Sequence, residues 1–151
     1  MGGSLDLAIR SSKEHLKDCA CKNLRMTTRV VTQYFDKAFQ PVGLRATQFA
    51  LLADISSRES STVGELADIF LMDQTTVTRN IEILKKKGYV DVRQGEDDSR
   101  KRYISITESG FVKLREAIPL WNNAQLVIEQ GVGEEKFREF LDTLSYIQKL
   151  I

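Results

Sequence analysis

One stretch of the chain, residues 62–102, limits the possible folds more than any other. Its first part predicts a short helix over Val63–Phe70, because Thr62 stands three positions before Glu65, a pattern typical of a helix start. Leu71–Met72 follows as a tight turn. The stretch therefore begins as one short helix that leads directly into a second.

The second helix has a recognisable start, end and buried side. Asp73 is a good N-cap because its carboxylate can accept from the amides of the first turn, and Gly88, directly after Lys87, is the usual residue beyond a helix end. Apolar residues at steps of four and three predict the buried side, which is Val77, Ile81 and Leu84. The opposite side and its flank then carry Gln74, Thr75, Thr78, Arg79 and Glu82.

A hairpin is predicted next. Residues 89–93 and 102–106 both alternate between apolar and polar types, and the loop between them is polar and contains Gly95. Two alternating runs around such a loop make a β-hairpin. Two helices joined by a tight turn and followed by a hairpin predict a winged helix-turn-helix.

The remaining segments read as helices. The first, Leu5–Phe39, has a weak point at Ser11–Ser12 that predicts a short helix followed by a long one. Three more are expected over residues 45–57, over 107–129 with a kink at Pro119, and over 134–150, with Gly131 and Gly133 as breaks. The predicted fold class is mainly α (α+β), with about six helices and a small hairpin wing.

Three regions follow from this order. Residues 41–110 form the winged helix-turn-helix, while residues 1–40 and 111–151 supply long amphipathic helices at the two ends. Apolar stripes of this size are a liability on a small monomer. We therefore expect a homodimer in which the terminal helices of two copies interleave as one unit.

The composition excludes several classes of protein. The chain has a net charge of +1, a single histidine (His15) and two cysteines with no metal-type spacing, so neither a metal set nor a catalytic constellation is expected. No apolar run is long enough to cross a bilayer, and no secretory signal is visible, which predicts a cytoplasmic protein without cofactors. The near-neutral charge argues weakly against nucleic acid, although residues 73–102 hold eight Lys/Arg against six Asp/Glu.

The exposed side of the second helix suits DNA bases. Glutamine pairs with adenine, arginine with guanine, and threonine offers both a hydroxyl and a methyl group. Thr76 and the helix N-terminus are expected to meet a phosphate through free amides. Lys85, Lys86 and Lys87 add phosphate attraction. The alternative is an ordinary solvated helix face, for which several threonines are an unusual choice.

The hairpin tip carries the most specific pattern. Asp98 stands two residues before Arg100, so its carboxylate is placed to hold the guanidinium while that group enters a minor groove. The alternatives are a solvated turn of mixed charge and a weak cation site at Glu96, Asp97 and Asp98.

Together these motifs resemble the MarR family of bacterial transcription regulators. The resemblance covers TVGELADIF, DQTTVTRNIEILKKKGYVDVR, the Asp98-x-Arg100 wing and SITESG, and it extends upstream to GLRATQFALLADI. It implies a homodimeric repressor or activator that binds a pseudo-palindromic DNA operator. It also implies DNA contact by Gln74, Thr75, Thr76, Thr78, Arg79 and Arg100, with Asp98 orienting Arg100 and Arg93 bracing the wing.

Two signals are open for regulation. In the first, a small aromatic or anionic effector binds where the terminal helices meet the winged domain, and the polar candidates there are Arg25, Thr28, Arg29 and Thr32. In the second, Cys19 or Cys21 is a redox-sensing thiol near basic side chains. We expect a repressor released by a ligand, and the alternatives are a thiol sensor and a winged-helix module that binds proteins instead of DNA. An enzyme is not expected.

Overall fold

The computed structural model describes residues 2–151, and its elements follow the predicted order. The helices are α1 (Gly2–His15), α2 (Ala20–Ala38), α3 (Ala46–Ser56), α4 (Val63–Phe70), α5 (Gln74–Lys86), α6 (Glu108–Val132) and α7 (Glu134–Leu150), with short 3-10 turns η1 (Leu16–Asp18) and η2 (Gln40–Val42). The strands are β1 (Ser61–Thr62), β2 (Val90–Gln94) and β3 (Arg102–Ile106). The mainly helical winged fold is confirmed.

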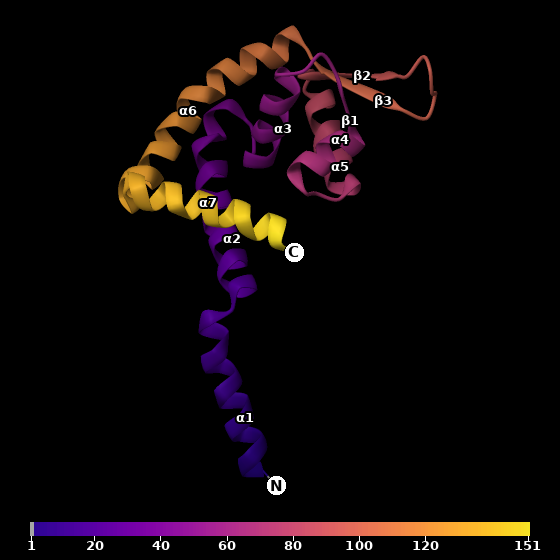
Figure 1. The fold of residues 1–151 in the computed structure, drawn as a ribbon. Helices are drawn as coiled ribbons and strands as arrows, with labels where there is room; N and C mark the ends of the chain where they lie inside the picture. Colours follow the sequence, from indigo (N-terminus) through magenta and orange to yellow (C-terminus); the bar gives the residue numbers. More distant parts are fainter. Residues whose placement is uncertain (1) are drawn as a thin grey trace.

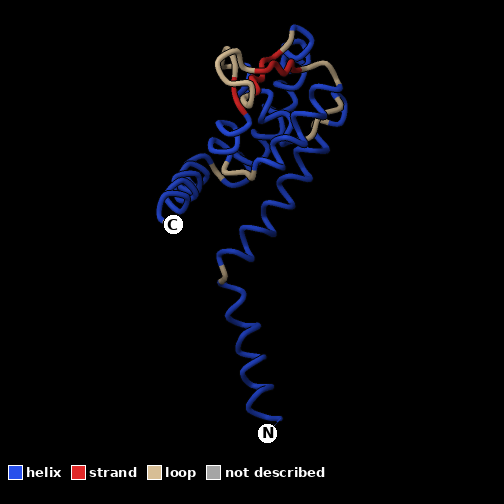
Figure 2. The backbone as a smooth tube through the Cα atoms, turned by 90° about the vertical axis from the view of Figure 1, so that its right-hand side faces the viewer, coloured by secondary structure: helices blue, strands red, loops and turns tan. Residues whose placement is uncertain are grey.

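The arrangement in space separates a compact middle from long ends. Figure 1 shows α3, α4 and α5 gathered beside the base of the β2–β3 hairpin, which projects outward as a wing. Helix α6 arches over α2 and α3, and α7 folds back from the end of α6, so that it passes in front of α2 in the view of Figure 1. Helix α1 points away from the rest of the chain in both Figure 1 and Figure 2, and all of its described residues are exposed.

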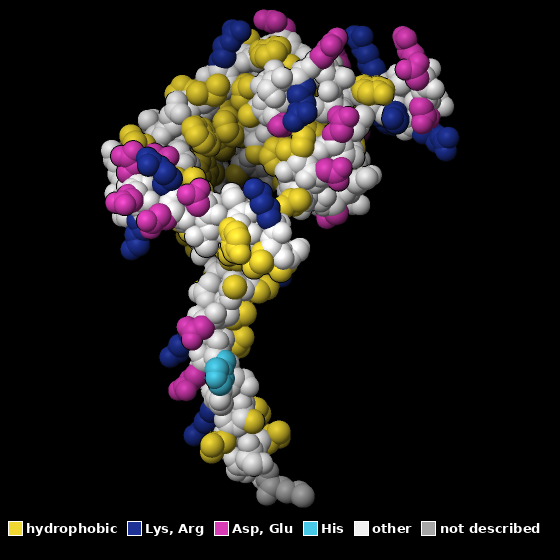
Figure 3. All heavy atoms as spheres, in the orientation of Figure 1, with side chains coloured by type: hydrophobic (Ala, Val, Ile, Leu, Met, Phe, Trp, Pro, Cys, Tyr) yellow, Lys and Arg dark blue, Asp and Glu magenta, His cyan; other side chains and the backbone are white. Residues whose placement is uncertain are grey.

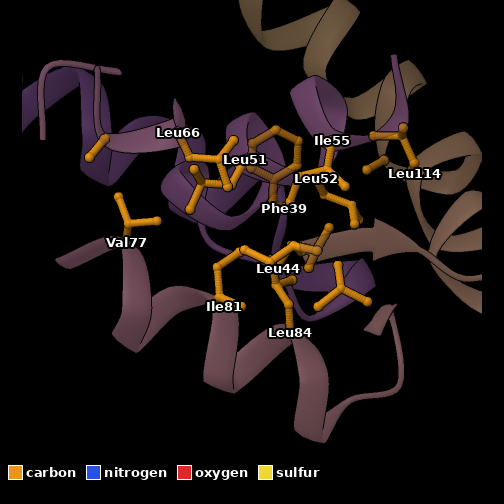
Figure 4. Close-up of a cluster of buried hydrophobic side chains, with 14 residues drawn as sticks. Phe39, Leu44, Leu51, Leu52, Ile55, Leu66, Val77, Ile81, Leu84 and Leu114 are labelled. Carbon is orange, nitrogen blue, oxygen red and sulfur yellow. The ribbon is translucent and has the colours of Figure 1, made fainter. Parts of the chain in front are cut away.

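The core lies where α3, α4 and α5 meet the sheet. It contains Leu51, Leu52 and Ile55 of α3, Leu66 of α4, and Val90 and Ile104 of the strands, with Phe39 from the end of α2 (Figure 4). The predicted stripe of α5 is confirmed, because Val77, Ile81 and Leu84 are each 3% exposed or less. Each such side chain contributes about 1.5–3 kcal/mol on burial, so α5 is held firmly by one face.

The sheet has three strands rather than the two of a simple hairpin. Its order is β1-β3-β2, with Ser61 opposite Ile104 and Val90 opposite Ile106. We expected Ser61 and Thr62 only as a helix start. They do start α4, since Thr62 and Glu65 form a capping box, but their backbone also pairs with β3. A two-residue strand leaves too little alternation for the sequence to reveal it.

The break in the N-terminal helix lies later than predicted. Both serines at the expected break fit inside α1, and Ser12 Oγ donates to the Ala8 carbonyl at 2.8 Å. The chain turns instead at η1 and Cys19, where the Asn23 side chain donates to the carbonyls of Lys17 and Cys19 at 2.8 and 2.9 Å. Satisfying these two carbonyls stabilises the turn.

One of the two predicted glycine breaks near the C-terminus is wrong. Gly131 lies within α6, which continues to Val132, and only Gly133 separates α6 from α7. Gly133 has a φ of 98°, whereas Gly131 has no such conformation. Pro119 lies inside α6, and Figure 1 shows this helix bowed.

The turn between α4 and α5 holds a leucine in a left-handed conformation. Leu71 has a φ of 50° and ψ of 41°, and its side chain is 72% exposed. The Met72 N–H donates to the Ala67 carbonyl at 2.9 Å, a closure that favours glycine at the left-handed position. Leu71 therefore carries backbone strain with little burial to offset it.

Replacing Leu71 with glycine is expected to raise the free energy of unfolding by roughly 0.5–1 kcal/mol, because the left-handed conformation costs a non-glycine residue about 1–2 kcal/mol. Urea unfolding of purified protein measures the change. Ile69→Gly is the matched control, since Ile69 is also an exposed apolar residue but lies in α4 and loses about 1 kcal/mol as glycine. Equal losses in both variants would contradict the assignment of strain to Leu71.

Candidate nucleic-acid interface

The N-terminus of α5 is fixed by Asp73. Its carboxylate accepts from the Thr76 N–H at 2.7 Å and from the Thr76 hydroxyl at 3.0 Å. These hydrogen bonds lower the pKa of Asp73, the backbone one most, so the cap is charged at neutral pH. The predicted N-cap is confirmed.

Thr76 thereby has a structural task that sequence reasoning did not assign. Its amide and hydroxyl are both engaged by Asp73, and its side chain is half-buried. The Thr76 N–H is therefore not one of the amides left to meet a phosphate. At this end of the helix those are the amides of Gln74 and Thr75, which precede it.

The outer side of α5 is an exposed row. Gln74, Thr75, Thr78 and Arg79 are all exposed, as the buried stripe on the other side requires. Thr75, Arg79, Glu82 and Lys86 follow one another at steps of four, three and four, so they lie along one line of the helix and point away from the core. The row offers hydroxyl, guanidinium and ammonium donors beside one carboxylate. We call α5 the reading helix.

The three lysines at the end of the reading helix differ in their surroundings. Lys86 continues the outer row. Lys87 turns back, and its Nζ donates to the Gly43 carbonyl in the connection between α2 and α3. Local pattern cannot distinguish these lysines, because the partner of Lys87 is 44 positions away in the sequence.

The tip of the wing is an ordered turn. The Gly95 N–H donates to the Lys101 carbonyl at 2.7 Å, and Gln94 Nε2 donates to the Ser99 carbonyl at 2.7 Å. Gly95 is required here, since a Cβ at this position would lie 2.7 Å from the Asp98 carbonyl oxygen.

Asp98 and Arg100 are paired as predicted. Asp98 Oδ1 accepts from the Arg100 N–H at 3.0 Å and lies 3.5 Å from Arg100 Nε. The Arg100 side chain is 93% exposed, so it stands clear of the protein while its base is held. Pairing of such exposed groups adds little stability, and its effect is on orientation.

The structure does not support two other interpretations of the wing, namely bracing by Arg93 and a cation site at its tip. Arg93 lies opposite Tyr103 in the β2–β3 ladder and is exposed, and within residues 2–151 it makes no ion pair that could brace the wing. The alternative of a cation site gains no support either, because among the described residues no group of three or more His, Cys, Asp or Glu side chains is placed to hold a metal ion, the Glu96–Asp98 run included.

Some of the residues predicted to bind an effector lie in the same hollow as the two candidate redox thiols. Arg25 and Arg29 line an open hollow of about 500 Å³ at the start of α2 together with Cys19, Cys21, Lys22 and Met26. Thr28 and Thr32 do not line it. Cys19 is the N-cap of α2 and not an internal helical residue, and both thiols are unpaired. Their redox role stays a prediction.

None of the helices described in residues 2–151 combines the length and apolar character needed to cross a membrane. A capped helix with one buried face and one polar face, next to a projecting hairpin, defines a winged helix-turn-helix protein.

Comparison with known proteins identifies the group within this class. The model of the MarR family matches residues 44–101, from the start of α3 to the wing tip. A transcriptional regulator from M. tuberculosis, MosR, solved in complex with DNA, is 36% identical and superposes with a TM-score of 0.76 over 87% of this chain and 97% of that one. The transcriptional repressor MprA of Escherichia coli is 29% identical over 124 residues, which are 76% of this chain and 70% of MprA.

A third relative has the same fold at lower identity. BpsR of Bordetella bronchiseptica, whose DNA binding is regulated by 6-hydroxynicotinic acid, has a TM-score of 0.78 at 20% identity and covers 86% of this chain and 93% of its own. The chain belongs to the MarR family. It is a transcription regulator and not an enzyme.

Proposed function

We propose that the protein is a homodimeric, sequence-specific DNA-binding repressor that a small ligand releases from its operator. The observation that carries this proposal is the two-sided character of the reading helix. Val77, Ile81 and Leu84 fix one face in the core, and the opposite face presents Thr75 and Arg79 to solvent. A helix held in this way suits a major groove, where it keeps its register against the bases.

The proposed contacts divide by their chemistry. Gln74, Thr75, Thr78 and Arg79 reach base edges, and Lys86 and the helix N-terminus meet phosphates. Arg100, held by Asp98, enters the minor groove beside the wing. A regulator that acts on the chromosome of a bacterium works in the cytoplasm, and we place the protein there.

The dimer is supported by apolar surface on the terminal helices. Met26, Val30 and Tyr34 of α2 stand at four-residue steps on one line and are 37–67% exposed. Figure 3 shows further apolar side chains in the hollow enclosed by α6 and α7 and along α1. A second copy that covers these surfaces makes residues 1–40 and 111–151 the dimerisation regions, and it sets the two reading helices about one DNA turn apart.

Release by a ligand is supported by a relative. The DNA binding of BpsR responds to a small aromatic acid, and its chain shares this fold. MprA is named a repressor, which favours the same sign of regulation here.

Salt dependence of DNA binding tests the proposal. Genomic fragments retained by the protein are labelled, and their affinity is measured by fluorescence anisotropy at rising salt concentrations. A dimer with six or more phosphate contacts is expected to lose roughly a thousandfold in affinity between about 50 and 200 mM salt. Two results would favour the protein-binding module instead. In the first, no genomic fragment binds more tightly than a random-sequence duplex. In the second, the affinity for DNA does not change with salt concentration.

A further inference from the structure

One exposed side chain of the reading helix has no part in the proposed DNA contacts. Glu82 belongs to the outer row and lies on it between Arg79 and Lys86. Figure 4 shows the buried residues of this helix, such as Ile81 and Leu84, pointing into the core, and Glu82 is exposed to solvent instead. The surface that is proposed to face the DNA therefore contains a carboxylate.

The cations beside Glu82 do not neutralise it. Arg79 stands three positions before it and Lys86 four positions after it, and both spacings allow an ion pair on a helix. Among residues 2–151, however, none of the ion pairs includes Glu82, Arg79 or Lys86. The carboxylate and its two cationic neighbours are therefore each available for a separate contact.

A free carboxylate in a DNA interface discriminates between bases. The phosphates repel it on DNA of any sequence, and a hydrogen bond from a base offsets that cost. In the major groove only cytosine and adenine present an amino group, and adenine places the acceptor N7 beside it. An ionised carboxylate has acceptors only, so cytosine is the base that it favours.

The position of Glu82 on the helix fits such a contact. Side chains three positions apart have Cβ atoms about 5–6 Å apart, and successive base pairs are about 3.4 Å apart, so Arg79 and Glu82 reach the same base pair or adjacent ones. Arginine pairs with O6 and N7 of guanine. Glu82 also lies seven positions after Thr75, which is about 10 Å along the helix axis, or roughly three base pairs.

We infer that Glu82 is a specificity-determining residue, which accepts a hydrogen bond from the 4-amino group of a cytosine beside the guanine that Arg79 contacts. Attraction to this cytosine strengthens binding to the operator, and repulsion from the phosphates weakens binding to other sequences. Both effects raise the ratio of specific to non-specific affinity. The inference rests on the proposed function, because it requires the reading helix to lie in a major groove.

Removal of the cytosine amino group tests the inference. Each cytosine of a retained operator is replaced in turn by pyrimidin-2-one, which still pairs with guanine but lacks the 4-amino group, and affinities are measured by fluorescence anisotropy. The unchanged protein is expected to lose about tenfold in affinity at one cytosine of each half-site. Glu82→Ala is expected to bind the unmodified operator and the one altered at that cytosine equally well. It is also expected to bind a random-sequence duplex more tightly than the unchanged protein does.

Glu139→Ala is the matched control for this experiment. Glu139 is also an exposed glutamate within a helix, but it lies on α7, outside the winged domain. This variant has the same change in net charge as Glu82→Ala. We expect it to lose affinity at the altered cytosine as the unchanged protein does.

Two results would overturn the inference. In the first, the unchanged protein binds the operator, but no cytosine amino group contributes to its affinity. In the second, Glu82→Ala loses as much affinity as the unchanged protein at every altered cytosine, so another residue makes the contact. Failure of the proposed function gives a different result, because the unchanged protein then binds no fragment more tightly than a random-sequence duplex, and that result would overturn both.

Discussion

Replacing Gly110 with alanine is expected to lower the free energy of unfolding by about 3 kcal/mol or more. A Cβ at this position would lie 2.2 Å from the Tyr89 carbonyl oxygen and 2.7 Å from Ile106 Cγ1. The Tyr89 oxygen cannot retreat easily, because it accepts from the Thr107 N–H at 3.0 Å. The added methyl must therefore push apart the start of α6 and the entry to β2, which is overpacking against backbone.

Gly64→Ala is the matched control for this experiment. Gly64 is also helical, but a Cβ there would meet nothing nearer than 3.9 Å, so the substitution is expected to raise stability by roughly 0.5 kcal/mol. Both variants are measured by urea unfolding with the same probe. A loss below about 1 kcal/mol in Gly110→Ala would mean that the contact between α6 and Tyr89 is more compliant than the structure indicates.

The second large effect concerns DNA. Arg100→Ala is expected to weaken binding to a retained operator by about 10- to 100-fold, because a guanidinium in a narrow minor groove contributes on the order of 1–3 kcal/mol. Stability and dimerisation are expected to stay unchanged, since the Arg100 side chain is 93% exposed and its one ion pair within residues 2–151 is with Asp98. Fluorescence anisotropy gives the affinity, and sedimentation gives the oligomeric state.

Two further variants make this result specific. Arg115→Ala removes one exposed arginine from α6, outside the wing, and controls for the loss of net charge. Asp98→Asn keeps the arginine but removes the charge that pairs with it. We expect this variant to lose less operator affinity than Arg100→Ala. If Arg100→Ala binds the operator as tightly as the unchanged protein, the wing is not part of the DNA interface, and the reading helix makes the contacts without it.

The reading helix shows how much of a site local pattern can reveal. The stripe of Val77, Ile81 and Leu84 follows from helical periodicity, and the cap at Asp73 follows from residue type. Both are properties of neighbours in sequence. The engagement of Thr76 by Asp73 is just as local, because an N-cap side chain accepts from an amide two or three residues further on, and this capping bond occupies the Thr76 amide that was expected to meet a phosphate.

The errors in the N- and C-terminal helices have a different origin. Ser11–Ser12 and Gly131 carry poor helix propensity, but each costs a helix only a fraction of a kcal/mol to about 1 kcal/mol, which an otherwise helical segment tolerates. The observed helix ends depend on two local features. The Asn23 side chain donates to two backbone carbonyls at the turn η1 between α1 and α2, and Gly133 takes a positive φ between α6 and α7.

By itself, the sequence determined the order of the helices, the buried side of the reading helix, and the pairing of Asp98 with Arg100, because periodicity, capping and two-residue spacing act over short distances. Only the tertiary structure decided which groups from distant segments meet. β1 joins β3, Tyr89 lies against Gly110, and Lys87 reaches Gly43 at a junction that also holds Asp36 and Gln48. These contacts depend on how α2, α3 and α5 pack around a shared core, and no pattern within a single segment encodes that packing.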